Sequence, residues 1–94
     1  MRQFDVVTYA GTPAVVVETD DLPQDYRIVV IPLMQNYPAV SRLNPVIDHD
    51  GQPHVLATRL IISVRRSELS RTGINVADYR DDIVRAMDTM IGTW

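Results

Sequence analysis

Residues 27–31, Arg-Ile-Val-Val-Ile, are the stretch that decides the fold. The four apolar residues follow one another without a break, and the run has the length of a strand, which is typical of a strand buried on both faces. We therefore place residues 27–31 at the centre of a sheet. We expect Pro32 to end this strand, because proline cannot donate to the hydrogen-bond ladder.

Other segments on both sides of this strand also favour β structure. Residues 3–9 are rich in β-branched and aromatic side chains and predict a strand, which a turn at residues 10–13 joins to a second strand at 14–19. Later in the chain, the sequence predicts strands at 44–48, 54–58 and 60–64, a hairpin turn at Asp50-Gly51, and irregular connections at 34–43 and 65–72. The chain is therefore mostly β.

The last segment has the spacing of an amphipathic helix. Apolar residues recur at intervals of three and four and form one stripe, made up of Tyr79, Ile83, Ala86, Met87, Met90 and Ile91. Asn75 is a candidate cap before the helix, and Gly92 is a natural terminator after it. We expect one C-terminal helix, and hence an α+β fold.

Length and composition limit the classes of protein to which the chain can belong. Its 94 residues are enough for a single domain at 1–94, and a domain of this size gains stability when dimerisation buries more surface. The chain has no cysteine, which favours a reducing cytoplasm, and no run long enough to suggest a signal peptide or a membrane span. With a formal charge of −3, a broad surface for direct nucleic-acid binding is not expected.

The sequence offers few candidates for a catalytic, metal-binding or phosphate-binding site. Asp48, His49, Asp50 and His54 could surround one hairpin, but their spacing matches no metal-ligand pattern. A nucleophile elbow and a phosphate-binding glycine loop are both missing from the sequence. We therefore expect no catalytic residues, no metal and no cofactor.

All nine basic residues are arginines, and one group of them is clustered in the sequence: Arg59, Arg65, Arg66 and Arg71. Such a cluster can contact RNA phosphates or the carboxylates of a partner, although a solvated loop is the more ordinary interpretation. Trp94 is the only tryptophan and lies beyond the predicted end of the helix. An aromatic residue there either packs against its own domain or dimer, or serves as an anchor for a partner.

Several segments resemble the CcdB family of bacterial toxins, in the order and nearly at the spacing of that family. They are Gln3-Phe4 with Val6 and Thr8-Tyr9, then Val30-Ile31-Pro32-Leu33, Leu43 with Pro45-Val46-Ile47, residues 58–64, and Asp82-Ile83 with Ala86. Each motif is weak alone, and their ordered combination over almost the whole chain is what is specific. The resemblance implies a small SH3-like β-barrel with an accessory antiparallel sheet and a C-terminal helix.

The resemblance also implies a function. A member of this family is the toxin of a toxin–antitoxin pair, forms a homodimer, and is neutralised by the disordered tail of a CcdA-like antitoxin. Its target is the A subunit of DNA gyrase, which it traps on cleaved DNA without being an enzyme. Carried over to this chain, the gyrase-binding residues are Leu22, Asp88, Ile91, Gly92, Thr93 and Trp94.

The C-terminus departs from the family. The best-known family pattern ends in Trp-Gly-Ile, whereas this chain ends in Gly92-Thr93-Trp94, with the aromatic two positions later. Two alternatives therefore stay open. The chain could be a MazF-like endoribonuclease on the same fold, with Arg59, Arg65 and Arg66 as its cations, or a toxin-fold protein with a different target or none.

Overall fold

The computed structural model describes residues 1–92 of the chain. Within them, seven strands and one α-helix follow in order: β1 (Asp5–Tyr9), β2 (Thr12–Val16), β3 (Arg27–Met34), β4 (Val46–His49), β5 (Gln52–Leu56), β6 (Ile62–Arg65), β7 (Leu69–Asn75) and α1 (Arg80–Ile91). The strands pair in the order β4-β5-β3-β2-β1-β7, with β6 also paired to β3, and every pair is antiparallel.

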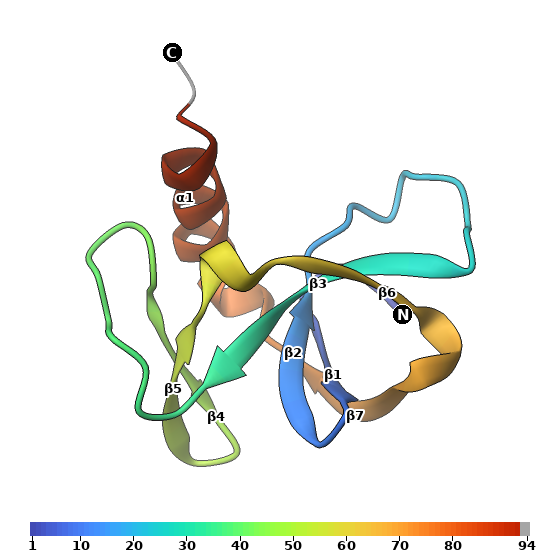
Figure 1. The fold of residues 1–94 in the computed structure, drawn as a ribbon, viewed down its shortest axis with the longest axis horizontal. Coiled ribbons are helices and arrows are strands. Elements are labelled where there is room, and N and C mark those ends of the chain that lie inside the picture. The colour runs from blue at the N-terminus through green and yellow to red at the C-terminus, as the bar shows by residue number, and fades with distance from the viewer. Residues whose placement is uncertain (93–94) are drawn as a thin grey trace.

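The sheet curls into a partial barrel, with the β4–β5 hairpin projecting from one side and α1 packed beside that hairpin (Figure 1). The predicted class is therefore confirmed: a barrel-like antiparallel sheet, an accessory hairpin and a C-terminal helix. Within the described part of the chain, no helix is long and apolar enough to cross a membrane.

Strand β3 is the centre of the sheet, as the sequence predicted. It pairs with β2 on one side, and on the other side with β6 at its start and β5 at its end. The prediction that Pro32 ends the strand is wrong, because β3 runs on to Met34. The carbonyl oxygen of Pro32 accepts a hydrogen bond from Ala57 N at 2.9 Å, on the side where the pairing with β6 has ended and that with β5 has not begun. A backbone N–H is not required at that point of the ladder.

The core forms two clusters on the two faces of β3, which confirms that this strand is buried on both sides. The first cluster lies between the sheet, the β4–β5 hairpin and α1, and its buried members are Phe4, Val6, Val15, Val17, Ile31, Leu33, Ile47, Leu56, Val76 and Ile83. The second comes from the strands of the curled sheet alone: Val7, Ala14, Val16, Ile28, Val30 and Val64.

Two predicted irregular segments contain strand residues. The turn predicted at 10–13 consists of Ala10-Gly11 only, and β2 already begins at Thr12. The segment 65–72, predicted as a loop, contains a 3₁₀ turn (η2, Arg66–Glu68) followed by β7, which pairs with β1. Strand β7 escaped prediction because its side chains are mostly exposed and therefore lack apolar alternation. It also carries a bulge at Gly73, where φ is +80°.

The predicted helix and its terminator Gly92 are confirmed, but Asn75 does not cap the helix, because α1 begins after Tyr79, which makes no side-chain capping hydrogen bond. The side-chain Oδ1 of Asn75 accepts a hydrogen bond from Ala77 N at 2.9 Å, in the 3₁₀ turn (η3, Ala77–Tyr79) that precedes α1. At the other end, Gly92 is left-handed with φ of +71°, and its N–H donates to the carbonyl oxygen of Asp88 at 2.9 Å.

Candidate partner-binding site

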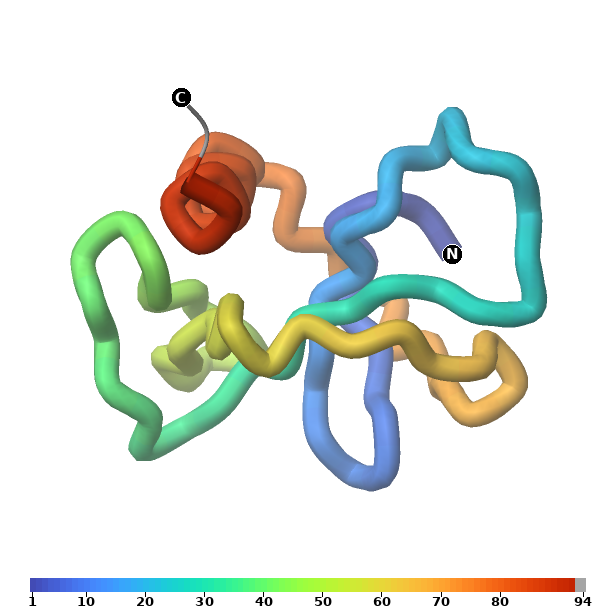
Figure 2. The backbone as a smooth tube through the Cα atoms, turned by 45° about the horizontal axis from the view of Figure 1, so that its top comes forward, coloured from blue at the N-terminus to red at the C-terminus, as the bar shows by residue number. Residues whose placement is uncertain are grey.

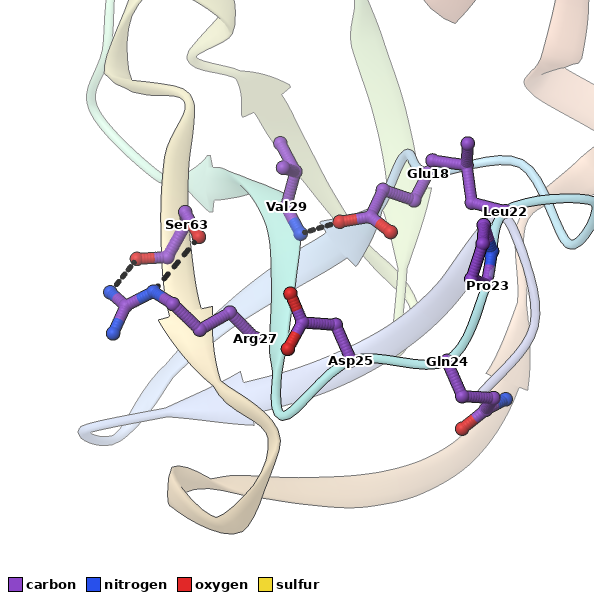
Figure 3. Close-up of a pocket in the computed structure, with 8 residues that line it drawn as sticks. All are labelled: Glu18, Leu22, Pro23, Gln24, Asp25, Arg27, Val29 and Ser63. Atoms are coloured by element: carbon purple, nitrogen blue, oxygen red, sulfur yellow. Dashed lines mark hydrogen bonds between the residues drawn. The ribbon is translucent and has the colours of Figure 1, made fainter.

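The loop 17–26, which joins β2 to β3, is held at both ends. At its start, Val29 N donates to Oε2 of Glu18 at 2.8 Å (Figure 3). At its end, the backbone N–H of Arg66 donates to the carbonyl oxygen of Tyr26 at 2.8 Å, and Nε of Arg66 donates to that of Asp25. The middle of the loop is therefore presented between two fixed ends.

Leu22 lies in this presented part. A turn, in which Leu22 N donates to the carbonyl oxygen of Thr19 at 3.3 Å, leaves the leucine side chain 52% exposed. Leu22 lines a cavity of about 510 Å³ together with Glu18 and Asp25 (Figure 3). The guanidinium of Arg27, also in the lining, donates from Nη2 to the carbonyl oxygen of Ser63 at 2.8 Å. The loop thus offers an apolar side chain among carboxylates.

The helix end, which we define as Asp88, Ile91 and Gly92, is the second part of the candidate site. Asp88 and Ile91 are three residues apart and share one side of α1. Ile91 is 66% exposed although it belongs to the apolar stripe predicted from the sequence, whereas Ile83 and Ala86 of that stripe are fully buried. Thr93 and Trp94, also predicted to bind the partner, lie outside the described residues.

The structure brings part of the predicted set together. Asp88, Ile91 and Gly92 lie within one turn of the helix, but the loop 17–26 that carries Leu22 is well separated from the end of α1 in both views (Figures 1 and 2). In a single copy, therefore, those predicted residues that lie within 1–92 form two exposed patches and not one. Their role in binding a partner stays a prediction.

Two exposed residues beside these patches were not predicted from the sequence. Tyr26 is the last residue of the loop and is 69% exposed, and Val84 is 38% exposed one turn before Asp88. Helical spacing from Asp88 and Ile91 could have identified Val84. Tyr26 is in phase with buried Ile28, so alternation predicts burial, and its exposure becomes visible only in the fold.

The four clustered arginines come from four different elements. Arg59 lies in the 3₁₀ turn η1 (Thr58–Leu60), Arg65 on β6 and Arg71 on β7, while Arg66 holds the loop as described above. The two histidines lie on the β4–β5 hairpin, which both Figure 1 and Figure 2 place on the opposite side of the molecule from η2. In residues 1–92, the histidines and the Arg65–Arg66 pair thus belong to separate regions.

The histidines contact one another. The His49 and His54 rings have centroids 5.2 Å apart in an edge-to-face arrangement, and Nδ1 of His54 lies 3.0 Å from the carbonyl oxygen of Gln52. Burial, reinforced by the neighbouring His54, lowers the pKa of His49, and Asp50 opposes this only in part. Among residues 1–92, no group of three or more His, Asp or Glu side chains is placed to hold a metal ion.

A family model described as CcdB protein matches residues 3–92, which is nearly the whole chain. A search of curated proteins gave no match. The matched range includes the loop 17–26 and the helix end.

Proposed function

The chain belongs to the CcdB family, and from this premise we propose that it is the toxin of a type II toxin–antitoxin module that binds the A subunit of DNA gyrase. The single observation that carries the proposal is the family match over residues 3–92. The side chains of Leu22 and Ile91, which the family resemblance assigns to target binding, are both exposed and aliphatic, and this supports the proposal.

The proposed action is binding without catalysis. A protein that binds one conformation of gyrase more tightly than the others shifts the population toward that conformation. If the preferred state is the one that holds cleaved DNA, binding traps the break. Leu22 and Ile91 would supply the apolar contacts, Asp88 would pair with a cation or N–H group of gyrase, and Trp94 would act as an aromatic anchor.

The proposal also includes an antitoxin that neutralises the toxin and a second copy that forms the homodimer. A CcdA-like antitoxin binds it through a disordered tail, and such a tail orders itself on binding, which lets it cover a large surface. The toxin acts as a homodimer in the cytoplasm, where gyrase and DNA are found. The left-handed Gly92 ends α1 directly after Ile91.

A DNA-cleavage assay tests the function. Purified protein is titrated into gyrase from the same source, with ATP and supercoiled plasmid, and linear plasmid is quantified after denaturation of the complex. We expect linear plasmid to increase with dose, and Ile91→Asp to reduce it strongly. Val46→Asp is the matched control, since Val46 is also aliphatic, is 47% exposed and lies on the accessory hairpin.

Two outcomes would overturn the proposal. One is the absence of linear plasmid when the protein is folded and gyrase is active. The other is cleavage of RNA by the protein at micromolar concentration, which would assign the chain to the endoribonuclease alternative.

A further inference from the structure

The loop 17–26 lies against a support made of two segments that are far apart in the sequence. Near the start of the loop, the backbone N of Gln3 donates to Oδ1 of Asp20 at 2.8 Å, and Figure 2 shows the start of the chain within the curve of the loop. Near its end, Nε of Arg66, in η2, donates to the carbonyl oxygen of Asp25. The polar contacts of the support thus fix the loop before and after Leu22.

Little space separates the loop from this support. Leu22, Gln24 and Arg66 line the same cavity, whose volume is only about 20 Å³. Val16 and Ile28, two members of the second core cluster, also line it. Arg66 therefore lies where a buried part of the sheet meets the loop residues that precede β3, and Leu22 is placed relative to the core through this contact.

Arg66 differs from its neighbour in the arginine cluster. Arg65 is exposed, whereas Arg66 is half-buried. The bond from Nε to Asp25 fixes the backbone of the loop, and the positive charge lies beside a segment that carries several carboxylates. Among these, Glu18 and Asp20 line the small cavity together with Arg66. A cation there offsets the mutual repulsion of the carboxylates, so Arg66 acts on the loop by both geometry and charge.

We propose that Arg66 is a positioning residue of the candidate site, which holds the loop 17–26 in the conformation that presents Leu22 to the partner. The inference rests on the proposed function, in which Leu22 contacts gyrase, and adds a residue that the family resemblance did not name. A loop that is ordered before binding loses less conformational entropy on binding. Arg66 thereby strengthens binding without touching the partner.

The variant Arg66→Lys isolates the geometric action. Lysine keeps the positive charge but has a methylene group, Cε, at the position where arginine has Nε, so the donor to Asp25 is lost. The backbone N–H of residue 66, which donates to the carbonyl oxygen of Tyr26 at 2.8 Å, is unchanged by the substitution. The variant therefore removes one side-chain hydrogen bond and leaves the backbone contact of η2 available.

Amide hydrogen exchange of the toxin alone, followed by NMR, measures the position of the loop. The reporter is the amide of Leu22, which donates to the carbonyl oxygen of Thr19 at 3.3 Å. In Arg66→Lys this amide should exchange about tenfold faster than in the wild type, because the loop opens more often. Amides of β3 should exchange as in the wild type, which shows that the variant is folded. The matched control Arg65→Lys, the same substitution at the exposed neighbour, should leave the Leu22 amide unchanged.

Plasmid cleavage tests whether Arg66 acts through Leu22. Arg66→Lys should raise the toxin concentration needed for half-maximal cleavage about fivefold. Leu22→Ala should raise it about tenfold in the wild type but less than about threefold in the Arg66→Lys background, because a misplaced leucine has less contact to lose. A general loss of stability would instead leave the effect of Leu22→Ala equal in the two backgrounds.

The exchange and cleavage measurements can each overturn the inference. Unchanged exchange of the Leu22 amide in Arg66→Lys overturns it, and so does an equal effect of Leu22→Ala in the two backgrounds. A wild type that yields no linear plasmid contradicts the proposed function instead. The exchange experiment needs no gyrase, so in that case it decides the role of Arg66 by itself.

Discussion

The open mouth of the curled sheet and the patches of the candidate site expose aliphatic side chains to similar degrees but in different surroundings. The mouth surrounds a cavity of about 320 Å³, and we define it by Tyr9, Pro32, Met34, Leu60 and Ile62. Ile62 at the mouth is 45% exposed, and Leu22 on the loop is 52% exposed. The mouth is uncharged and continues a buried core, whereas Leu22 lies on the loop 17–26 and lines a cavity together with the carboxylates of Glu18 and Asp25. Under the proposed function, the mouth would meet the second copy of the homodimer, and the loop and the helix end would meet gyrase. The comparison teaches that exposed area alone does not identify a partner, and that charge and continuity with the core do.

The largest expected effect is that of a charge at the helix end, which should impair plasmid cleavage and leave the dimer intact. Ile91→Asp should lower the yield of linear plasmid by about 100-fold or more at a fixed toxin concentration, because it puts a charge where an apolar contact is proposed. It should leave the dimer dissociation constant within about threefold of the wild type. The measurements are the cleavage assay and sedimentation. Equal losses of dimer and activity would mean that the helix end belongs to the dimer contact, so that the two regions would not have different partners.

Leu22→Ala should have a smaller effect, again on plasmid cleavage. Truncating one exposed aliphatic contact at an interface typically costs about 1–2 kcal/mol, which corresponds to about a tenfold rise in the toxin concentration needed for half-maximal cleavage. Because the side chain is half exposed, the free energy of unfolding should stay within about 0.5 kcal/mol of the wild type. Pro23→Ala, one residue further along, is a control for altered loop backbone. An unchanged dose response would remove Leu22 from the proposed binding surface.

The elements that could be predicted from the sequence are those with a strong local signal. The central strand, the Asp50-Gly51 hairpin and the helix with its Gly92 terminator were all correctly predicted, because apolar periodicity and turn residues specify each of them. Strand β7 could not be predicted, because pairing with β1 holds an exposed segment that has no periodicity. Pro32 was misjudged because the gap between two neighbouring strands is a tertiary feature.

The candidate site likewise has features that a local pattern predicts and features that depend on the whole fold. Helical spacing predicts that Asp88 and Ile91 share a side of α1, and the structure agrees. The separation of Leu22 from the helix end depends on the fold of the whole sheet, which no local pattern contains. The mouth depends on register, because only the pairing Val30↔Ile62 tells that Ile62 continues the inner face of β3.

Gly92 tests whether the helix end is fixed before binding. Its φ of +71° is strained for a residue with a Cβ, so Gly92→Ala should lower the free energy of unfolding by about 1 kcal/mol. Gly92→Asn is the matched control, because asparagine tolerates the left-handed conformation better and should cost less than about 0.5 kcal/mol. Urea unfolding measures both. Equal stability of the two variants would show that the left-handed turn does not hold the end of α1 in place.

The smallest expected effect belongs to the histidine pair, which lies on the β4–β5 hairpin and in neither region compared above. Burial and the neighbouring His54 lower the pKa of His49 below its ordinary value of 6.5. The unfolded chain therefore takes up a proton on this residue at higher pH than the folded chain does, so stability falls as pH decreases below 6.5 toward the folded pKa.

Acidification from about pH 7.5 to about pH 5.5 should accordingly lower Tm, and His49→Gln should make that decrease smaller. Asp5 does not interfere. Although burial would raise the pKa of Asp5, hydrogen bonds from Arg2 N and Asn75 Nδ2 outweigh it and hold the pKa below the ordinary 3.8, so its contribution is lost only at more acidic pH.

Since the hairpin carries neither Ile62 nor Ile91, the dimer dissociation constant of the His49→Gln variant should match that of the wild type at both pH values. A pH-dependent change in that constant, abolished by His49→Gln, would instead place the hairpin in the dimer contact and move the twofold axis away from the mouth.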